Sequence, residues 1–90
     1  MATRKLYAIW DNAVGSYDAV HTAISRGMAI RQFIDAGEDE KSALAKHPND
    51  FILFELGDID MMTGKVSCPL APQNLGSMAS FKAAVQPVSN

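Results

Sequence analysis

The sequence contains little cysteine and no long apolar run. Its one cysteine, Cys68, cannot form a disulfide within the chain, which fits a reducing compartment. No stretch approaches the roughly 18 consecutive apolar residues that a membrane-spanning helix needs, and the first residues are too polar for a signal peptide. These absences predict a soluble protein that is not exported and does not enter a membrane.

A strong charge of one sign is also absent. Ten acidic and eight basic residues give a net charge of −2, and 48% of the 90 residues are hydrophobic. The sequence-independent affinity of a protein for nucleic acid grows with the number of phosphates that its cations neutralise. With a negative net charge, the chain could bind nucleic acid only through a local basic patch. The hydrophobic content excludes wholesale disorder. We expect one domain over residues 1–90, with an ordered core at 5–85 and a flexible tail at 86–90.

Signatures of catalysis, of cofactor binding and of metal binding are missing as well. His21 and His47 have no partner at the spacing of metal ligands or of an acid–base pair. Asp58 and Asp60 share one face of a predicted strand but lack the glycine and glutamate positions of a calcium loop. Cys68 has no histidine arranged to activate it, and we expect it to be buried or half-buried. The sequence therefore predicts no enzyme, no cofactor and no metal.

What is present is a short apolar strand in the middle of the chain. Within residues 50–66, the run Phe51–Leu56 is aromatic and β-branched and is interrupted only by Glu55, which is typical of a buried strand. Gly64 then predicts a hairpin before Val66, because glycine accepts a positive φ without steric cost. This segment supplies two antiparallel strands, and we expect the core to form against it.

Two further strands are expected before this hairpin. Residues 5–10 carry apolar side chains on both faces, as a central strand does. Residues 17–24 fit either an edge strand or a helix, and the extended form is favoured. After the hairpin, Pro69 and Pro72 remove backbone donors, so the sheet is expected to end there.

The helices are predicted from their caps and their apolar spacing. Ser25 can cap a helix over residues 26–36 that Gly37 ends. Shorter helices are expected at residues 41–46 and 74–85. Together these elements predict a small α+β domain with an antiparallel sheet of about three to four strands and two to three short helices packed on one face.

Basic and aromatic residues are the best candidates for a binding surface. Two cations lead directly into two aromatic residues in the first strand, and two arginines lie on the polar side of the 26–36 helix. Single-stranded nucleic acid is held by such sets, because cations follow the backbone and each stacked base contributes about 1–3 kcal/mol. The alternative is that the rings belong to the core and the cations solvate the surface. The predicted nucleic-acid contacts are Arg4, Lys5, Tyr7, Trp10, Arg26 and Arg31.

Several motifs, spread over most of residues 5–82, are shared with one viral family. The segment from Lys46 to Gly57 places Lys-His-Pro-Asn-Asp before Phe-Ile-Leu-Phe-Glu-Leu-Gly, and an Asp-Met-Met-Thr-Gly turn follows at residues 60–64. Residues 7–11 (Tyr-Ala-Ile-Trp-Asp) and 28–33 (Met-Ala-Ile-Arg-Gln-Phe) add independent matches. In these motifs the chain resembles the small nonstructural protein of gokushoviruses, single-stranded DNA phages of the Microviridae.

The resemblance implies a non-enzymatic protein of the host bacterial cytoplasm that is absent from the mature virion. It further implies binding of single-stranded DNA during the switch to single-stranded genome synthesis or packaging. A homo-oligomer would double a basic patch that is weak in one copy. The alternative is a protein-interaction module that engages a viral replication or capsid protein, or a host factor.

Overall fold

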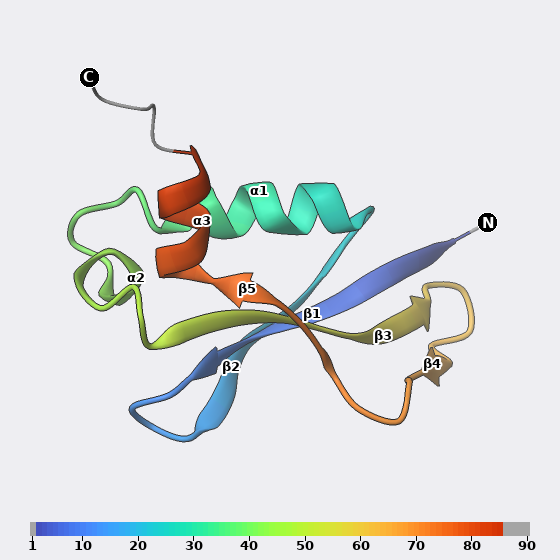
Figure 1. The fold of residues 1–90 in the computed structure, drawn as a ribbon. Coiled ribbons are helices and arrows are strands. Elements are labelled where there is room, and N and C mark those ends of the chain that lie inside the picture. The colour runs from blue at the N-terminus through green and yellow to red at the C-terminus, as the bar shows by residue number, and fades with distance from the viewer. Residues whose placement is uncertain (1, 86–90) are drawn as a thin grey trace.

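The computed structural model describes residues 2–85, so the predicted tail at 86–90 lies outside the described residues. It confirms an α+β fold with a five-stranded antiparallel sheet and three helices (Figure 1). In chain order the elements are β1 (Thr3–Asp11), β2 (Ser16–Ala23), α1 (Arg26–Ala36), α2 (Ala43–Lys46), β3 (Phe51–Asp60), β4 (Val66–Ser67), β5 (Gln73–Ser77) and α3 (Met78–Val85).

Strand β3 is the centre of the sheet. On one side it pairs along its whole length with β1, which in turn pairs with β2. On its other side it pairs with two short strands: β4 lies beside Asp58 and Ile59, and β5 lies beside residues 52–55. The central apolar run of the sequence therefore supports every other strand, either directly or through β1.

The last third of the chain corrects the sequence prediction. The prolines lie in a loop, as expected, but the sheet does not end there, because Gln73–Ser77 returns to β3 as β5. The register shifts next to Gly76, whose φ is 136°, and the last helix begins only at Met78 rather than at residue 74. The QNLGS segment has weak strand propensity, and pairing with an open edge of β3 decides its conformation.

Local structure in the first half follows the predicted signals. The Ser25 hydroxyl accepts a hydrogen bond from the Met28 amide at the start of α1, and Gly37 ends that helix. The extended form predicted for residues 17–24 is confirmed as β2. Its register shifts opposite residues 7–9 of β1, where Ala19 has a φ of 54°, a left-handed conformation that is uncommon for a non-glycine residue.

Gly57 lies next to a third register shift, between β1 and β3. Its φ is 155°, and a Cβ atom at this position would collide with the carbonyl oxygen of Ser67. The backbone of the segment after β4 therefore passes against β3 at a point where only glycine fits without rearrangement.

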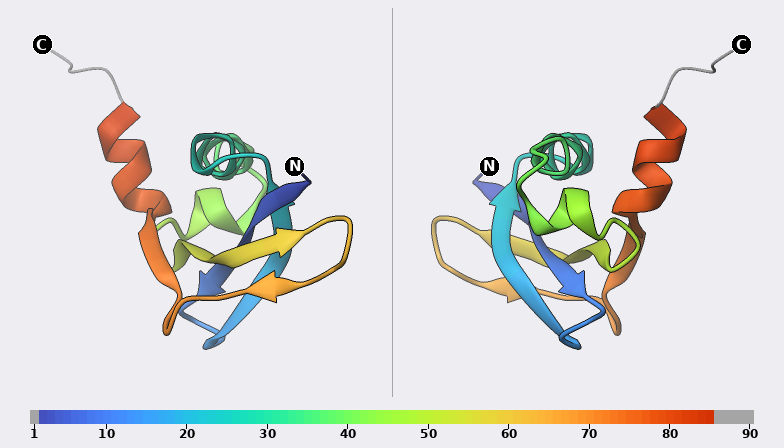
Figure 2. Two further views of the ribbon diagram at one scale, coloured as in Figure 1. Left: turned by 90° about the vertical axis from the view of Figure 1, so that its right-hand side faces the viewer. Right: turned by 90° about the vertical axis from the view of Figure 1, so that its left-hand side faces the viewer.

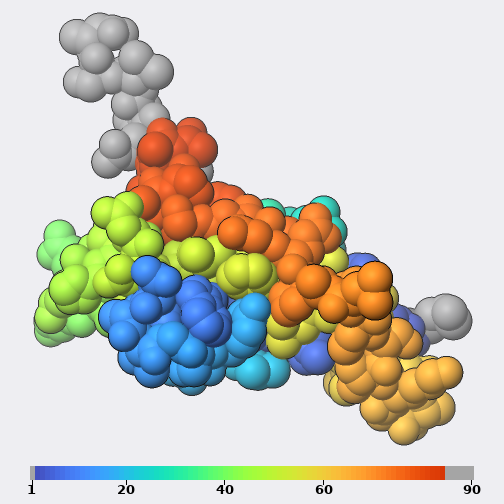
Figure 3. Space-filling view, turned by 60° about the horizontal axis from the view of Figure 1, so that its bottom comes forward, coloured from blue at the N-terminus to red at the C-terminus, as the bar shows by residue number. Residues whose placement is uncertain are grey.

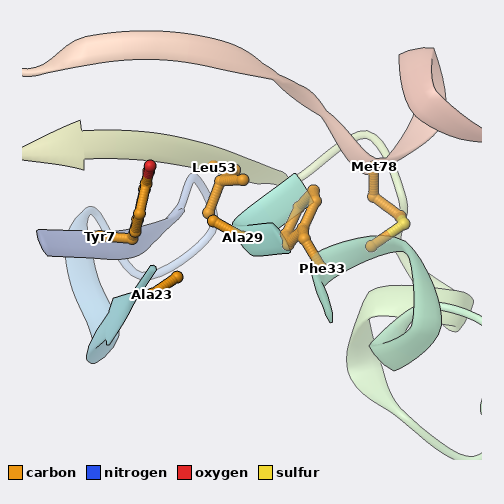
Figure 4. Close-up of a cluster of buried hydrophobic side chains, with 6 residues drawn as sticks. All are labelled: Tyr7, Ala23, Ala29, Phe33, Leu53 and Met78. Atoms are coloured by element: carbon orange, nitrogen blue, oxygen red, sulfur yellow. The ribbon is translucent and has the colours of Figure 1, made fainter. Parts of the chain in front are cut away.

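All three helices lie on one side of the sheet (Figure 2). The core forms between them and the sheet, where the side chains converge in Figure 4. It consists of Tyr7, Ala23, Ala29, Phe33, Leu53 and Met78. Figure 3 looks onto the opposite side, where β1 and β2 (blue), β3 (yellow) and β5 (orange) reach the surface with no helix across them. We call this helix-free side of the sheet the open face.

Candidate nucleic-acid interface

Strand β1 divides its side chains between the core and the open face. Tyr7 is fully buried in the core, with Ile9 packed beside it. Arg4, Leu6 and Trp10 alternate with these residues and therefore point to the open face. The prediction that this strand carries apolar side chains on both faces is confirmed, with Tyr7 on one face and Trp10 on the other.

Three aromatic side chains form a row across the open face. The Trp10 and Tyr17 ring centroids lie 5.0 Å apart, and those of Tyr17 and Phe54 lie 5.4 Å apart, both in edge-to-face geometry. The rings come from β1, β2 and β3, because the register sets Trp10 opposite Tyr17 and Ala8 opposite Phe54. We call Trp10, Tyr17 and Phe54 the aromatic row.

The aromatic row is accessible, and its surroundings are almost uncharged. Tyr17 is 39% exposed, while Trp10 and Phe54 are half-buried. Cross-strand partners point to the same side of a sheet, and the register sets Arg4 opposite Ile59. Among the strand positions of residues 2–85, Arg4 is the only Lys, Arg, Asp or Glu that the register assigns to the open face.

The register assigns the other charged strand residues to the helix-covered side, where Glu55 is the centre of a polar network. Glu55 accepts hydrogen bonds from the Tyr7 hydroxyl and from Nε of Arg26 through Oε1, both at 3.1 Å, and from Nη2 of Arg26 through Oε2 at 3.1 Å. Arg26 also donates to the Gln73 side chain, which ties α1 to β5. The network thus links β1, β3, β5 and the first residue of α1.

The network fixes the ionisation of its members. The Arg26 hydrogen bond lowers the pKa of Glu55 below its ordinary value, although burial opposes the shift. Burial, assisted by the hydrogen bond to Glu55, raises the pKa of Tyr7 to about 12. The carboxylate is therefore charged and the phenol neutral at physiological pH.

A second ion pair joins β1 to β3 on the same side. Lys5 Nζ lies 2.9 Å from an Asp58 carboxylate oxygen, and this hydrogen bond raises the pKa of Lys5. Asp58 and Asp60 share a surface hollow with Thr3, Lys65 and Ser67. Because the hollow carries charges of both signs, it favours neither an anion nor a cation.

The six predicted contacts do not form one surface. Arg4 and Trp10 lie on the open face, whereas Lys5 and Arg26 are ion-paired on the helix-covered side. Arg31 is exposed on α1, roughly 140° around the helix from Arg26 at about 100° per residue. A continuous positive strip made of these four cations is therefore absent from the folded chain.

Tyr7, another predicted nucleic-acid contact, is not available for binding. It has no exposed surface, and its hydroxyl is bonded to Glu55, so its ring offers no face to a base. The sequence reasoning missed two residues of the aromatic row, Tyr17 and Phe54. The alternation of residues 17–24 places Tyr17 in a strand, but only the register shows that it lies beside Trp10 and Phe54.

Other site types find little support in the described chain. Within residues 2–85, no three His, Cys, Asp or Glu side chains are grouped as metal ligands would be. The helices of that same stretch are too short or too polar to cross a bilayer. Cys68 was expected to be buried or half-buried but is exposed, because it lies in the loop after β4 at the edge of the sheet.

Comparison with known proteins gives one match. Neither a curated protein nor a solved structure matches the chain. A family model does match, and it covers residues 4–81, which include β1 except for Thr3, the other four strands, and the first part of α3. That family is described as Phage ORF5 protein, and the chain therefore belongs to the Phage ORF5 protein family.

Proposed function

We propose that this phage protein binds single-stranded DNA on the open face of its sheet. The observation that supports this proposal best is the aromatic row, which crosses a helix-free sheet face that carries one arginine, Arg4, toward the other end of β1. Base stacking on aromatic side chains contributes about 1–3 kcal/mol per base and tolerates any sequence, since every base has a π-face. Four-stranded sheets with aromatic residues on a free face recur in single-strand binding modules, and this likeness is an analogy of architecture.

In this proposal, stacking supplies more of the affinity than charge. Lys5 and Arg26 are ion-paired with Asp58 and Glu55, so Arg4 is the main cation on the open face. For single strands the logarithm of the binding constant falls with the logarithm of salt concentration by about 0.7 for each neutralised phosphate. One arginine therefore predicts a slope of about −0.7, whereas a strip of four cations would give about −3.

The single tryptophan provides the test. Trp10 lies in the aromatic row and is the only tryptophan of the chain, so a base stacked there should quench its fluorescence. A short oligodeoxythymidine is titrated into the protein at several salt concentrations. We expect saturable quenching with a shallow salt dependence. Absence of quenching and of any change in oligonucleotide anisotropy at low salt would reject the proposal.

Matched variants separate the open face from the rest of the surface. Arg4→Ala and Arg31→Ala remove the same charge from the open face and from α1. We expect Arg4→Ala to weaken binding about 5-fold to 10-fold, as the loss of one phosphate contact at low salt would. Arg31→Ala is expected to leave the affinity within about 2-fold. Equal losses in the two variants would show that net charge alone decides binding.

The biological role that we propose follows from the family resemblance. It is the protection of newly displaced genome strands in the bacterial cytoplasm during the switch to single-stranded synthesis or packaging, without entry into the mature virion. Modest, weakly salt-dependent affinity suits a protein that must release the strand to the capsid. Release by competition with capsid protein is the corresponding measurement in a reconstituted system.

A second candidate function is docking of a partner protein, and the segment around β4 favours it. We call residues 61–72 the arm. Its apolar side chains are strongly exposed: Met61 is 49% exposed, Met62 82%, Val66 47% and Leu70 fully. Methionine adapts to irregular partner surfaces. A viral replication or capsid protein that co-purifies after nuclease treatment, and is lost in Leu70→Lys, would support this function over DNA binding.

A further inference from the structure

The open face is more apolar than a monomer's surface needs to be. Six apolar residues of β1, β2 and β3 reach it, and their cross-strand neighbours there include just one charged residue, Arg4. A helix-free sheet face of this kind is a candidate interaction surface. The six residues are Leu6, Trp10, Tyr17, Ile52, Phe54 and Ile59.

The core on the other side of the sheet is small. Among residues 2–85, the buried cluster on the helix-covered side has six members, and two of them are alanines. Domains of about this size are modestly stable because they bury a limited fraction of their surface. Covering the open face would add a second apolar layer to the sheet.

The size of the open face fits a standard protein interface. The three long strands have 8 to 10 residues each, and β4 and β5 together form a shorter fourth row beside β3. With about 4.8 Å between strands and about 3.3 Å per residue, the sheet has a footprint of roughly 540 Å². A stable complex buries about 800 Å² of accessible surface on each partner. Accessible area exceeds the flat footprint because side chains project from the sheet, so the open face alone can supply this area.

We propose that the open face packs against the open face of a second copy of this chain, and that this dimer and single-stranded DNA compete for it. The competition rests on the proposed function, whereas the dimer does not. Two sheets packed face to face keep their strands within about 30° and share an apolar core. In the dimer Trp10 is covered, so the dimer cannot bind DNA on this face. Only the monomer binds DNA.

The charge distribution of the open face and the irregular β2 edge favour face-to-face packing with a second copy of the chain. The face lacks a carboxylate on its strand positions and holds one arginine at one end, so two copies can meet with little charge to desolvate. Two copies are not expected to join their sheets edge to edge through β2, because a register shift distorts that edge strand at Ala19. Such a distortion disfavours backbone pairing with another strand. The Asp18 and His21 side chains there occupy the Ala19 amide and carbonyl.

Sedimentation of the purified chain over a wide concentration range tests the dimer. We expect a monomer–dimer equilibrium and a blue shift of Trp10 emission as the dimer forms. Thr22→Arg adds a cation beside Leu6 on the open face and should raise the dimer dissociation constant at least about 10-fold. Gln32→Arg adds the same charge on exposed α1 and should leave it unchanged. A monomer at all concentrations, or equal effects of the two variants, overturns the proposal.

Oligodeoxythymidine separates this inference from the proposed function. We expect the oligonucleotide to convert dimer to monomer, and the apparent affinity of the wild type for it to fall as the protein concentration rises into the dimeric range. A dimer that binds the oligonucleotide without dissociating overturns the competition. A dimer that is broken by Thr22→Arg but binds no oligonucleotide supports the interface and rejects the DNA function. The Trp10 shift of the wild type keeps the test valid if Thr22→Arg fails to fold.

Discussion

Glu55 supplies a polar contact between the sheet and α1, beside the apolar contacts of the core. It interrupts an otherwise apolar run, and in sequence it looks like a defect in a buried strand. In the structure it is 9% exposed and receives donors from Tyr7 and from Arg26. A buried carboxylate is tolerated only when it is paired and hydrogen-bonded, and here both conditions are met.

Removing the Tyr7 hydroxyl should have a measurable cost. Tyr7→Phe removes one donor to buried Glu55, and we expect the free energy of unfolding to fall by about 1 kcal/mol in urea denaturation. The matched variant is Tyr17→Phe, at the other tyrosine of the chain, which is 39% exposed and should change stability by less than about 0.5 kcal/mol. Equal effects would argue against the buried hydrogen bond.

Tyr7 also predicts an alkaline limit of stability. Its pKa rises from 10 in the unfolded chain to about 12 in the folded protein, so its neutral form stabilises the fold fully below pH 10. This contribution is lost as the pH rises from 10 to about 12. The melting temperature of the wild type should fall in that window more steeply than that of Tyr7→Phe, measured by circular dichroism.

Glu55 predicts the corresponding acid limit. Its folded-state pKa lies below the ordinary value of 4.5, so the carboxylate stabilises the fold fully above pH 4.5, and this stability is lost as the pH falls through the lowered pKa. Glu55→Gln should cost about 1–2 kcal/mol at neutral pH and flatten the acid dependence of the melting temperature. The control is Glu38→Gln, at an exposed loop carboxylate. An unchanged acid profile in Glu55→Gln would contradict the assignment.

Within the elements, Gly57 of β3 and Gly27 of α1 have different surroundings, so we expect their substitution by alanine to have opposite effects on stability. Gly57→Ala forces a Cβ into the Ser67 carbonyl oxygen at a φ of 155°, and should lower the free energy of unfolding by about 2 kcal/mol or more. Gly27 lies in α1, and a Cβ atom there would meet nothing within 4 Å. Gly27→Ala should therefore raise the free energy of unfolding by about 0.5–1 kcal/mol. Chemical denaturation of the two variants compares them directly.

Elements with local signals were predictable from the sequence, and those that depend on distant partners were not. Helix α1 begins after Ser25 and ends before Gly37, and both capping residues are adjacent to the helix in sequence. Strand β5 was missed because its conformation depends on an open edge of β3, some 20 residues away. The same holds for the site: composition identified Trp10 and Arg4, but the aromatic row depends on a register that joins three strands.

For the whole molecule, hydrogen exchange should follow the strand order. Strands β1 and β3 pair along their full length, so their amides should exchange most slowly. Residues 61–72 are exposed throughout and β4 holds only two residues, so the arm should exchange fastest. Exchange measured by mass spectrometry at low protein concentration checks this order. Slow exchange in the arm at that concentration would contradict the described fold.

The pairing of Thr3 with Asp60 has a consequence for synthesis on the ribosome. Strand β1 emerges early, but its main partner, β3, is translated much later. Until then, the only part of the sheet that the nascent chain can form is the two-stranded β1–β2 ribbon, which is marginally stable without further strands. A topology dominated by such distant contacts folds in milliseconds to seconds rather than microseconds. We therefore expect nascent chains halted before residue 51 to remain protease-sensitive and to engage host chaperones.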